Sequence, residues 1–555
     1  MDDSRFTDLD LAFADFIAGQ SEVATGQKEC LRLVARELSR ALGEGHSCLP
    51  LTAEDERLLR GLDAVGDGLT ARPLVLWRGR LYLSRYFHYE RRLARHIVDL
   101  AGAAAAGPPA GGETPPLPGR DERQRQAVEL ARQRALAIVC GGPGTGKTTT
   151  VVAMLAALLQ EAPAEAMPAV ALAAPTGKAA MRLGEAVGRS LSRLNLSERV
   201  ARAIPTVATT LHRLLGVRRG SSSFVHNADN PLPWDVVVVD EASMVDLAMM
   251  CKLTLAIKPG ARLILLGDKD QLASVESGAV LADLIASLPE NTVELTTTYR
   301  FEEGIASLAE AIRAGQGQRA WQLLCQGTAE SVALLGEEGL DELDRRYGEI
   351  FAELASLESC DAQRALTLFG RFRVLSALQH GPRGVAALNK RVELALASRG
   401  FAVRPGTWYH GRPVLITRND YGLGLFNGDT GVCLRHGEGG ELRVWFERAE
   451  GGLCSFAPSR LPECQTVYAM TVHKSQGSEF DEVAVVLPRE DSRVLGRELL
   501  YTAVTRARKR VSLLVSEDVL HLTLSRAIRR HSGLGEWLGD QGDGSPARAG
   551  RGQGQ

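Results

Sequence analysis

Short apolar runs alternate with longer amphipathic stretches through the middle and the last part of the chain. LAIVCGG, AVALAAPT, DVVVVDEA and RLILLGD lie between about residues 121 and 290, and VYAMTV, EVAVVLP and RVSLLVS follow after residue 463. Continuous apolar strands between helices are typical of parallel sheets that are buried on both faces. The pattern therefore predicts an α/β protein with two parallel-sheet domains.

The first hundred residues have a different pattern, with apolar positions at helical spacing and then a strand-like pair, PLVLW and RLYLSRYF. Residues 101–120 are too rich in alanine, glycine and proline to hold one packed shape. We therefore expect a mostly helical N-terminal domain over residues 1–110 and a linker over residues 111–120. This first part of the chain has no spacing that is typical of a catalytic site.

A β-rich segment interrupts the second parallel-sheet domain. Residues 404–462 contain the turn signals NGD and GEGG and few helical patterns, which predicts a small inserted barrel. We accordingly expect the first parallel-sheet domain over 121–290 and the second over 291–403 and 463–535. Residues 536–555 end in SPARAGRGQGQ and are expected to form a disordered tail.

Composition excludes several classes of protein. Of the 555 residues, 45% are hydrophobic and 24% are charged, which is typical of a soluble protein with a well-filled core. The net charge of −2 argues against a protein that coats duplex DNA by charge alone, but a narrow strand channel needs only local basic groups. The chain shows no signal peptide and no apolar run near the ~20 residues that span a bilayer. The nine scattered cysteines form no CxxC pair and indicate reduced thiols in a cytoplasmic protein.

A glycine-rich segment, GGPGTGKTTT, follows the strand-like LAIVC and precedes the helix-like VVAMLAALLQ. It matches the strand–GxxxxGK[ST]–helix context of a phosphate-binding loop, and a chance match to the bare pattern in a chain of this length is only about 0.03. Backbone N–H groups and the helix N-terminus favour phosphate there. Lys147 is predicted to neutralise the β- and γ-phosphates of ATP, and Thr148 to ligate Mg²⁺. The predicted nucleotide-binding residues are Gly141, Gly142, Pro143, Gly144, Thr145, Gly146, Lys147, Thr148 and Thr149.

Two adjacent acids follow the apolar run VVVV in the segment VVVVDEAS. Beside a phosphate loop, Asp240 is predicted to hold the metal ion through water, and Glu241 to orient or deprotonate the attacking water. Many P-loop proteins, including switches, transporters and kinases, share these two elements. Further motifs are needed to choose among them.

Six more segments resemble the motifs of superfamily-one helicases of the RecD type, and the resemblance covers about residues 120–535. For motifs Ia, Ib, III, IV, V and VI, in that order, the segments are APTGKAA (174–180), TLHRLLG (210–216), LLGDKDQLASVESGAVL (265–281), TYRF (298–301), TVHKSQGSEFDEV (471–483) and YTAVTRARKR (501–510). The resemblance implies two RecA-like P-loop domains, with an SH3-like barrel inserted in the second. It also implies an ATP-dependent DNA helicase.

The resemblance assigns further residues to the nucleotide. Gln271 is expected to sense the γ-phosphate, Gln124 to contact the adenine, and Gly477 and Glu479 to join the nucleotide site. A motor needs its nucleotide in a cleft between two domains, so that hydrolysis changes their separation. Arg300 and Arg506 lie in the second domain and suit a permanently charged phosphate clamp that completes the site when the cleft closes. Taken alone, an arginine in a basic run such as TRARKR is usually part of a solvated surface.

Six residues in motifs Ia, Ib and V are expected to contact the backbone of single-stranded DNA. Taken singly, the histidines among them are better explained by helix packing or capping, and the lysine by an ordinary surface position; their place inside the motifs favours contact with the strand. In the inserted segment, Trp408 and Tyr409 are either stacking surfaces for bases or part of the barrel core. The expected DNA-binding residues are Thr176, Lys178, Thr210, His212, Thr471 and His473.

Two forms of the family compete. GEGHSCLPL (43–51) and RLYLSRYFHYERRLA resemble the subunit form, which belongs to a helicase–nuclease heterotrimer, the RecBCD enzyme or exodeoxyribonuclease V. That form implies DNA ends as the substrate, RecB-like and RecC-like subunits as partners, 5′–3′ movement, and docking of residues 1–110 on the RecC-like chain. No nuclease centre is evident in this chain. The alternatives are a free-standing helicase or, from another class, a structural subunit whose nucleotide site is an assembly switch.

Overall fold

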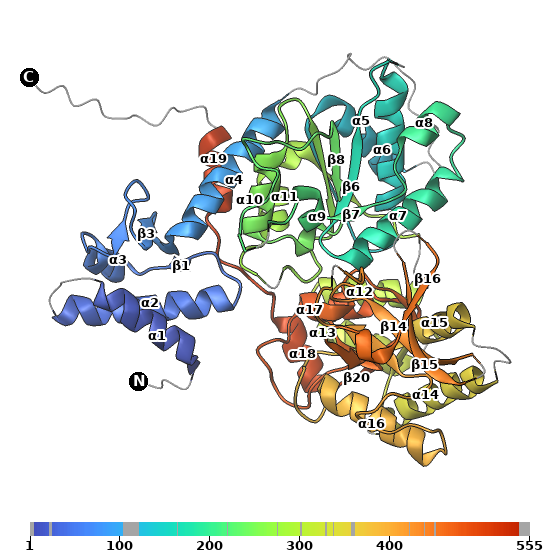
Figure 1. Cartoon of the computed structure of the whole chain (residues 1–555). Coiled ribbons are helices and arrows are strands. Elements are labelled where there is room, and N and C mark those ends of the chain that lie inside the picture. The colour runs from blue at the N-terminus through green and yellow to red at the C-terminus, as the bar shows by residue number, and fades with distance from the viewer. Residues whose placement is uncertain are drawn as a thin grey trace, which may run out of the picture.

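The computed structural model (Figure 1) has two large lobes and a smaller N-terminal part beside them. The expected linker, 111–120, and Arg300 lie outside the described residues. Within the described part of the chain, no helix is long and apolar enough to cross a membrane. The structure describes residues 5–20, 25–103, 121–163, 165–218, 220–274, 276–299, 302–327, 330–336, 338–356, 361–420, 422–437, 439–448 and 451–542.

The N-terminal part combines helices with a small sheet. Thr7 caps the first helix and forms a capping box with Asp10. The core of this part contains Leu31 and Leu38 of α2 and the strand residues Leu74 and Leu81. The helices are α1 (Asp8–Gly19), α2 (Thr25–Gly43) and α3 (Ala53–Leu59), and the strands, in sheet order, are β1 (Leu49–Pro50), β4 (Arg80–Leu83), β3 (Leu74–Trp77) and β2 (Val65–Gly66).

The first large lobe contains a six-stranded sheet in which every neighbouring pair of strands is parallel. Apolar runs form its central strands, as the sequence pattern predicts. In sheet order the strands are β10 (Thr292–Leu295), β5 (Leu136–Gly141), β9 (Arg262–Gly267), β8 (Val236–Val239), β6 (Val170–Ala174) and β7 (Thr209–Thr210). The helices are α5 (Glu122–Gln133), α6 (Lys147–Glu161), α7 (Gly177–Leu191), α8 (Glu198–Ala203), α9 (Leu211–Leu215), α10 (Leu247–Ala256) and α11 (Val280–Ser287).

Two helices that the sequence prediction placed outside this lobe pack on its sheet. Helix α4 (Ser84–Gly102) contributes Leu93 and Ile97 to the core beneath β8 and β9, and α19 (Leu534–Gly542) contributes Leu534 and Leu538. In Figure 1 the two helices lie side by side at the edge of the upper lobe. The predicted start of a disordered tail at residue 536 is therefore wrong, because α19 continues to residue 542. The predicted end of the N-terminal domain at residue 110 likewise does not separate two cores, because α4 already packs in the core of the first large lobe.

The second lobe contains a five-stranded parallel sheet with helices on both faces. One apolar core includes α12, α13, α17 and α18, and the other includes α14, α15 and α16. In sheet order the strands are β11 (Val332–Leu334), β20 (Ala507–Leu514), β19 (Phe480–Val486), β12 (Phe372–Ser376) and β18 (Ala469–Thr471). The helices are α12 (Glu303–Arg313), α13 (Gly317–Gln326), α14 (Gly339–Ala355), α15 (Ala362–Arg371), α16 (Val385–Ser398), α17 (Arg497–Val504) and α18 (Glu517–Ser525).

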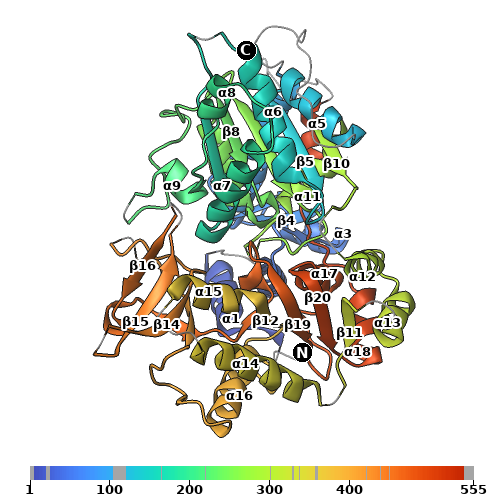
Figure 2. The same ribbon diagram turned by 90° about the vertical axis from the view of Figure 1, so that its right-hand side faces the viewer.

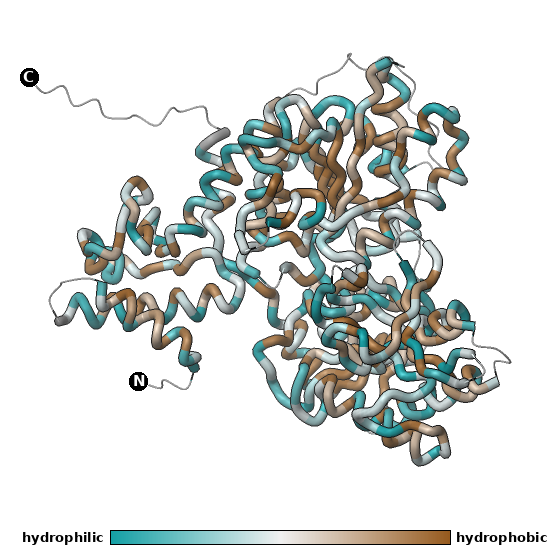
Figure 3. The backbone as a smooth tube through the Cα atoms, viewed as in Figure 1, coloured by the Kyte–Doolittle hydropathy of each residue, from teal (hydrophilic) through white to brown (hydrophobic). Residues whose placement is uncertain are grey.

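An antiparallel sheet interrupts the second lobe, in the part of the chain where the sequence predicts a barrel. Val414, Ile416, Cys433, Val444 and Phe446 form its core. Figure 2 shows its strands beneath α9 of the first lobe, and Figure 3 shows apolar segments concentrated inside both lobes. The strands, in sheet order, are β16 (Leu453–Phe456), β15 (Glu441–Glu447), β14 (Thr430–His436), β13 (Pro413–Ile416) and β17 (Cys464–Thr466).

Candidate functional site

The phosphate loop joins β5 to α6 and depends on glycine. Gly144 and Gly146 have φ angles of 81° and 83°, which favour a residue without a side chain. A Cβ atom at Gly141 would lie 2.7 Å from the carbonyl oxygen of Leu295 in the neighbouring strand. The Lys147 ammonium donates to the carbonyl oxygens of Gly141 (2.6 Å) and Gly142 (3.0 Å), so it lies over the loop. This arrangement presents N–H groups, a helix N-terminus and one cation to a phosphate.

Gln124 and Tyr299 lie against the same loop. Gln124 is buried on α5, and a Cβ atom at Gly146 would lie 2.8 Å from its Nε2 atom. The Tyr299 N–H donates to the carbonyl oxygen of Gly144 at 3.0 Å, while its ring is 59% exposed. Sequence reasoning quoted TYRF as a motif but did not select Tyr299. An exposed aromatic ring beside a phosphate loop offers a surface on which a base can stack.

The two predicted acids lie at the carboxyl end of β8. The Glu241 N–H donates to Oδ1 of Asp240 at 2.8 Å. Burial, and then the charge of Glu241, raise the pKa of Asp240 to about 6, while Lys147 opposes the shift. Glu241 has a φ angle of 52°, a left-handed conformation that costs about 1–2 kcal/mol for a residue with a side chain. Such strain is concentrated at functional sites, where the surrounding structure fixes it.

The side chains of Thr148 and Asp240 fit the oxygen ligands that Mg²⁺ prefers, a hydroxyl and a carboxylate. Both residues line the same cavity as the phosphate loop. Magnesium usually binds through one or two protein oxygens together with phosphate oxygens and water. The part of the chain that the structure describes contains no cluster of three or more His, Cys, Asp or Glu residues suited to a metal ion.

A buried arginine of the second lobe meets a glutamine of the first. Arg506 is 3% exposed and donates to Oε1 of Gln271, which follows β9. The same guanidinium donates to the carbonyl oxygens of Thr502 (3.1 Å) and Ser478 (3.3 Å). Gln271 in turn donates from Nε2 to Asp268 at 2.9 Å. A continuous chain of hydrogen bonds therefore crosses from the end of β9 to β20.

Two more hydrogen bonds cross the same boundary. The Leu272 N–H donates to Oγ1 of Thr502 at 2.9 Å, and Nε2 of Gln476 donates to the carbonyl oxygen of Leu272 at 2.9 Å. All three residues are buried. Because unpaired buried polar groups are costly, these contacts fix how the segment after β9 sits against the second lobe.

A cavity of about 1000 Å³ lies between the lobes and brings many of the predicted residues together. It begins at the phosphate loop and extends past α7 to the antiparallel sheet. The predicted nucleotide residues that line it are Pro143, Gly144, Gly146, Lys147, Thr148, Thr149, Asp240, Glu241, Gln271, Gly477, Glu479 and Arg506. Gln124, Gly141, Gly142 and Thr145 do not line it, although they pack around the loop.

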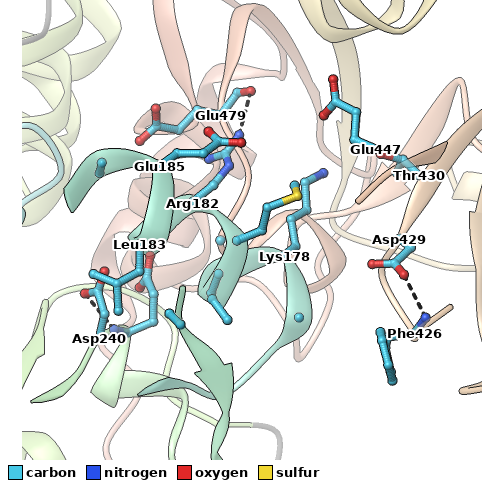
Figure 4. Close-up of a pocket in the computed structure, with 18 of the residues that line it drawn as sticks. Lys178, Arg182, Leu183, Glu185, Asp240, Phe426, Asp429, Thr430, Glu447 and Glu479 are labelled. Atoms are coloured by element: carbon cyan, nitrogen blue, oxygen red, sulfur yellow. Dashed lines mark hydrogen bonds between the residues drawn. The ribbon is translucent and has the colours of Figure 1, made fainter. Parts of the chain in front are cut away.

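Helix α7 carries a pair of cations into this cavity (Figure 4). Thr176 caps the helix by accepting from the Ala179 N–H, and Lys178 and Arg182 are one turn apart. Burial, followed by the charges of Arg182 and Arg373, lowers the pKa of Lys178 to about 7. Arg182 donates to the carbonyl oxygen of Glu479 in the second lobe at 3.2 Å. Sequence reasoning missed Arg182, although its position four residues after Lys178 places both on one face of a helix.

The antiparallel sheet reaches the first lobe beside α7. The Arg213 guanidinium lies 4.4 Å from the centre of the Phe426 ring, and a Cβ atom at Gly177 would lie 3.7 Å from Phe426. The Phe426 N–H donates to Asp429 at 2.7 Å. Burial raises the pKa of Asp429, while Lys178 and Arg213 oppose the shift. Arg213, Phe426 and Asp429 line the cavity and were not selected from the sequence.

The other expected DNA-binding residues have local roles as well. Thr210 lines the cavity and caps α9, while the Thr471 hydroxyl accepts from the Lys474 N–H at 3.3 Å. His212 contacts the ring of Phe224 edge to face, at 5.8 Å between centres. Burial and the charge of Arg530 lower the pKa of His473. Thr176, His212, Thr471 and His473 lie outside the cavity lining.

The two aromatic residues of the insertion have different surroundings. Tyr409 is buried, and its hydroxyl donates to Glu393 at 2.8 Å and lies 3.0 Å from the hydroxyl of Tyr468. It is therefore a core residue and not a stacking surface. Trp408 packs on the core of the antiparallel sheet, with the Arg412 guanidinium 4.6 Å from its ring centre.

Three family models match the chain. An AAA domain matches residues 124–277, and a UvrD-like helicase C-terminal domain matches residues 466–514. The N-terminal domain of RecBCD enzyme subunit RecD matches residues 2–62. Together with the phosphate loop and the two-lobed fold, these matches define the class of the protein as a P-loop ATPase with helicase domains.

Curated relatives define the family more narrowly. A Mycolicibacterium smegmatis protein called RecBCD enzyme subunit RecD is 44% identical over 485 residues, which cover 85% of this chain and 86% of that protein. A Haemophilus influenzae protein of the same name is 37% identical over 476 residues, which cover 75% of this chain and 72% of that protein. The ATP-dependent RecD2 DNA helicase of Deinococcus radiodurans is 34% identical and covers 82% of this chain and 57% of that protein. The chain belongs to the RecD family, and it is an ATP-dependent DNA helicase.

The strained position of Glu241 leads to a prediction. We expect Glu241→Gln to bind ATP with unchanged affinity but to lower kcat by about 10²–10⁴-fold, because an amide cannot accept the proton of the attacking water. Equilibrium binding of a fluorescent ATP analogue and steady-state phosphate release measure the two quantities. Hydrolysis within twofold of the wild type would remove Glu241 as the residue that activates water.

Proposed function

We propose that this chain is an ATP-driven motor that moves 5′ to 3′ along single-stranded DNA. The observation that carries the proposal is the buried contact between Arg506 and Gln271, which links the two lobes beside the phosphate loop. A switch needs only to bind and release nucleotide. A motor needs ATP hydrolysis in one lobe to change the contacts of the other lobe. An arginine that bonds across the cleft beside the phosphate can transmit that change.

Each nucleotide residue takes a distinct role in this proposal. Lys147 neutralises the β- and γ-phosphates, while Thr148 and Asp240 hold Mg²⁺, which screens the phosphate charge. Glu241 orients the attacking water. Arg506 stabilises the charge that develops on the γ-phosphate, and Gln271 reports the state of that phosphate. Arg300 is proposed as a second phosphate clamp, by its position in the TYRF motif.

Residues that contact the adenine base and residues of motif V complete the proposed nucleotide site. We assign Gln124 to the adenine edge, and we add Tyr299 as a stacking surface because its exposed ring lies beside the loop. Gly477 has a φ angle of 66°, and a Cβ atom there would lie 3.2 Å from the side chain of Ala179. Glu479 accepts from Arg182 through its carbonyl oxygen. The segment that contains Gly477 and Glu479 therefore connects the nucleotide site to α7.

The DNA strand is proposed to follow the part of the cavity beyond the nucleotide site. Lys178 and Arg182 supply positive charge from α7, and Arg213 of α9 supplies it where the antiparallel sheet meets the first lobe. Basic side chains along a groove bind phosphates without reading sequence. Thr176, Thr210, His212, Thr471 and His473 remain proposed backbone contacts near this path.

The chain is proposed to work with partners. Its relatives from Mycolicibacterium smegmatis and Haemophilus influenzae are called RecBCD enzyme subunits, and residues 2–62 match the N-terminal domain of such a subunit. We therefore propose a cytoplasmic heterotrimer with RecB-like and RecC-like chains that processes DNA ends in double-strand break repair. Residues 1–110 are the proposed docking part.

DNA-dependent hydrolysis tests the function directly. We expect oligo-dT to accelerate ATP hydrolysis by the full chain or by the reconstituted complex, because the strand and nucleotide share one cavity. Lys147→Gln is the control and is expected to lower kcat by at least ~10²-fold, because it removes charge from the phosphate site. It should leave the circular dichroism spectrum and partner binding unchanged. Hydrolysis that oligo-dT does not accelerate in either preparation would contradict the motor.

The low pKa of Lys178 predicts a pH dependence of DNA binding. With a pKa of about 7, the charged fraction of this side chain falls from about nine tenths at pH 6 to about one tenth at pH 8. We therefore expect oligo-dT affinity to weaken as pH rises through 7, since the phosphate contact needs the ammonium. Fluorescence anisotropy measures it, with Lys178→Arg as the matched variant that stays charged. Equal pH dependence in both proteins would contradict a phosphate contact at Lys178.

A further inference from the structure

After α18 the chain returns from the second lobe to the first, through residues 526–533, which we call the return segment. In Figure 1 it runs from α18 to α19, which lies beside α4. At its start, Arg526 pairs with Asp491 at 2.6 Å and accepts from the Arg497 N–H at 3.0 Å. At its end, Glu90 of α4 accepts from the Ser532 hydroxyl and the Gly533 N–H. Both ends of the segment are therefore fixed to different parts of the fold.

Arg530, in the middle of the return segment, binds one loop of the first lobe. Its guanidinium donates to the carbonyl oxygens of Ser274 (2.5 Å), Glu276 (2.9 Å) and Gly278 (2.8 Å). All three acceptors belong to the loop that follows Gln271. A planar fork with several donors can hold such a turn, which a lysine cannot match. Hydrogen bonds from a charged donor are also stronger than neutral ones.

This loop starts at the contact between the lobes. Gln271 accepts from Arg506, and the next residue, Leu272, bonds to Thr502 and Gln476. The loop is therefore held at its beginning by the second lobe and two to six residues later by Arg530. Its conformation decides where the Gln271 side chain lies relative to Arg506.

The end of the loop reaches the N-terminal part of the chain. The Gly278 N–H donates to the carbonyl oxygen of Gly45 at 2.9 Å. Gly45 has a φ angle of 89°, and a Cβ atom there would lie 2.7 Å from Cζ of Arg530. The His531 N–H donates to Nδ1 of His46 at 2.8 Å, and the two imidazole rings stack with 4.8 Å between centres. Arg530 is thus enclosed between the loop and the N-terminal part.

We propose that Arg530 is a positioning residue for ATP hydrolysis: it holds the loop after Gln271 so that Gln271 meets Arg506, and it connects that loop to the N-terminal part around Gly45. The inference rests on the proposed function, because Gln271 affects turnover only if the chain hydrolyses ATP at this site. It adds a physical route by which the position of the N-terminal part changes hydrolysis.

Substitution of Arg530 tests the proposal in the full chain or complex. We expect Arg530→Ala to lower the oligo-dT-stimulated kcat by about ten- to a hundredfold, because small displacements of catalytic groups have effects of that size. The KM for ATP should stay within twofold, since the phosphate loop is untouched. Arg530→Lys should recover only part of the rate. Arg529→Ala, at the exposed neighbouring arginine, is the matched control and should hydrolyse ATP as the wild type does.

A second pair of variants approaches Arg530 from the N-terminal side. Gly45→Ala places a methyl group against the guanidinium and should reproduce the loss of kcat at unchanged KM. Gly61→Ala is the matched control, because Gly61 also has a left-handed backbone, with φ of 83°, but has nothing within 4 Å of a built Cβ. It imposes the same kind of backbone cost in the same part of the chain without touching Arg530.

The outcomes separate the inference from the function on which it rests. A wild-type chain that oligo-dT does not stimulate contradicts the proposed function. If oligo-dT stimulates the wild type but the kcat of Arg530→Ala equals that of Arg529→Ala, the inference alone is overturned. An Arg530→Ala protein that loses kcat, ATP affinity and melting temperature together, with Gly45→Ala no slower than Gly61→Ala, also overturns it, because Arg530 then serves only stability.

Discussion

A buried guanidinium without a partner is among the most costly groups in a protein interior, and Arg506 is buried at the boundary between the two lobes. Two of its hydrogen bonds go to carbonyl oxygens of its own lobe, those of Thr502 and Ser478, but the third, to Gln271, forms only while the segment after β9 stays against the second lobe. Any change in the separation of the lobes must break or replace the bond between Arg506 and Gln271. The position of the phosphate relative to Arg506 and the position of the lobes are therefore coupled.

Other features of the site follow from this constraint. The phosphate loop follows β5 and the pair Asp240–Glu241 follows β8, and the carboxyl ends of these parallel strands, with β9 between them, face the same cleft. Helix α7 extends that cleft, with Lys178 and Arg182 pointing into it and Arg182 bonded to the second lobe. The antiparallel-sheet insertion meets the first lobe through Phe426, whose ring lies under Arg213 of α9. Nucleotide and strand can thus act on the same set of contacts between the lobes.

The sequence predicted the parallel sheets and the phosphate loop because both depend on local patterns, apolar runs and glycines at fixed spacing. It did not reveal which segments share a core. Leu538 follows Leu534 at helical spacing, but the SPARAGRGQGQ sequence beyond them led to the prediction of a tail from residue 536. Arg182, Arg213 and Phe426 become neighbours only through the packing of distant segments. Tyr409 proved to be a core residue. Its hydroxyl bonds to Glu393, sixteen positions earlier in the chain, and no motif in the sequence marks that pair.

The coupling between Gln271 and Arg506 is tested most directly by a double-mutant cycle on the DNA-stimulated kcat. Gln271→Ala and Arg506→Ala should each lower kcat, and the double variant should be no slower than the slower single variant, because Gln271 acts through Arg506. Effects that multiply in the double variant would show that the two residues act independently. That result would contradict the account, because the contact between the lobes would then carry no part of the coupling.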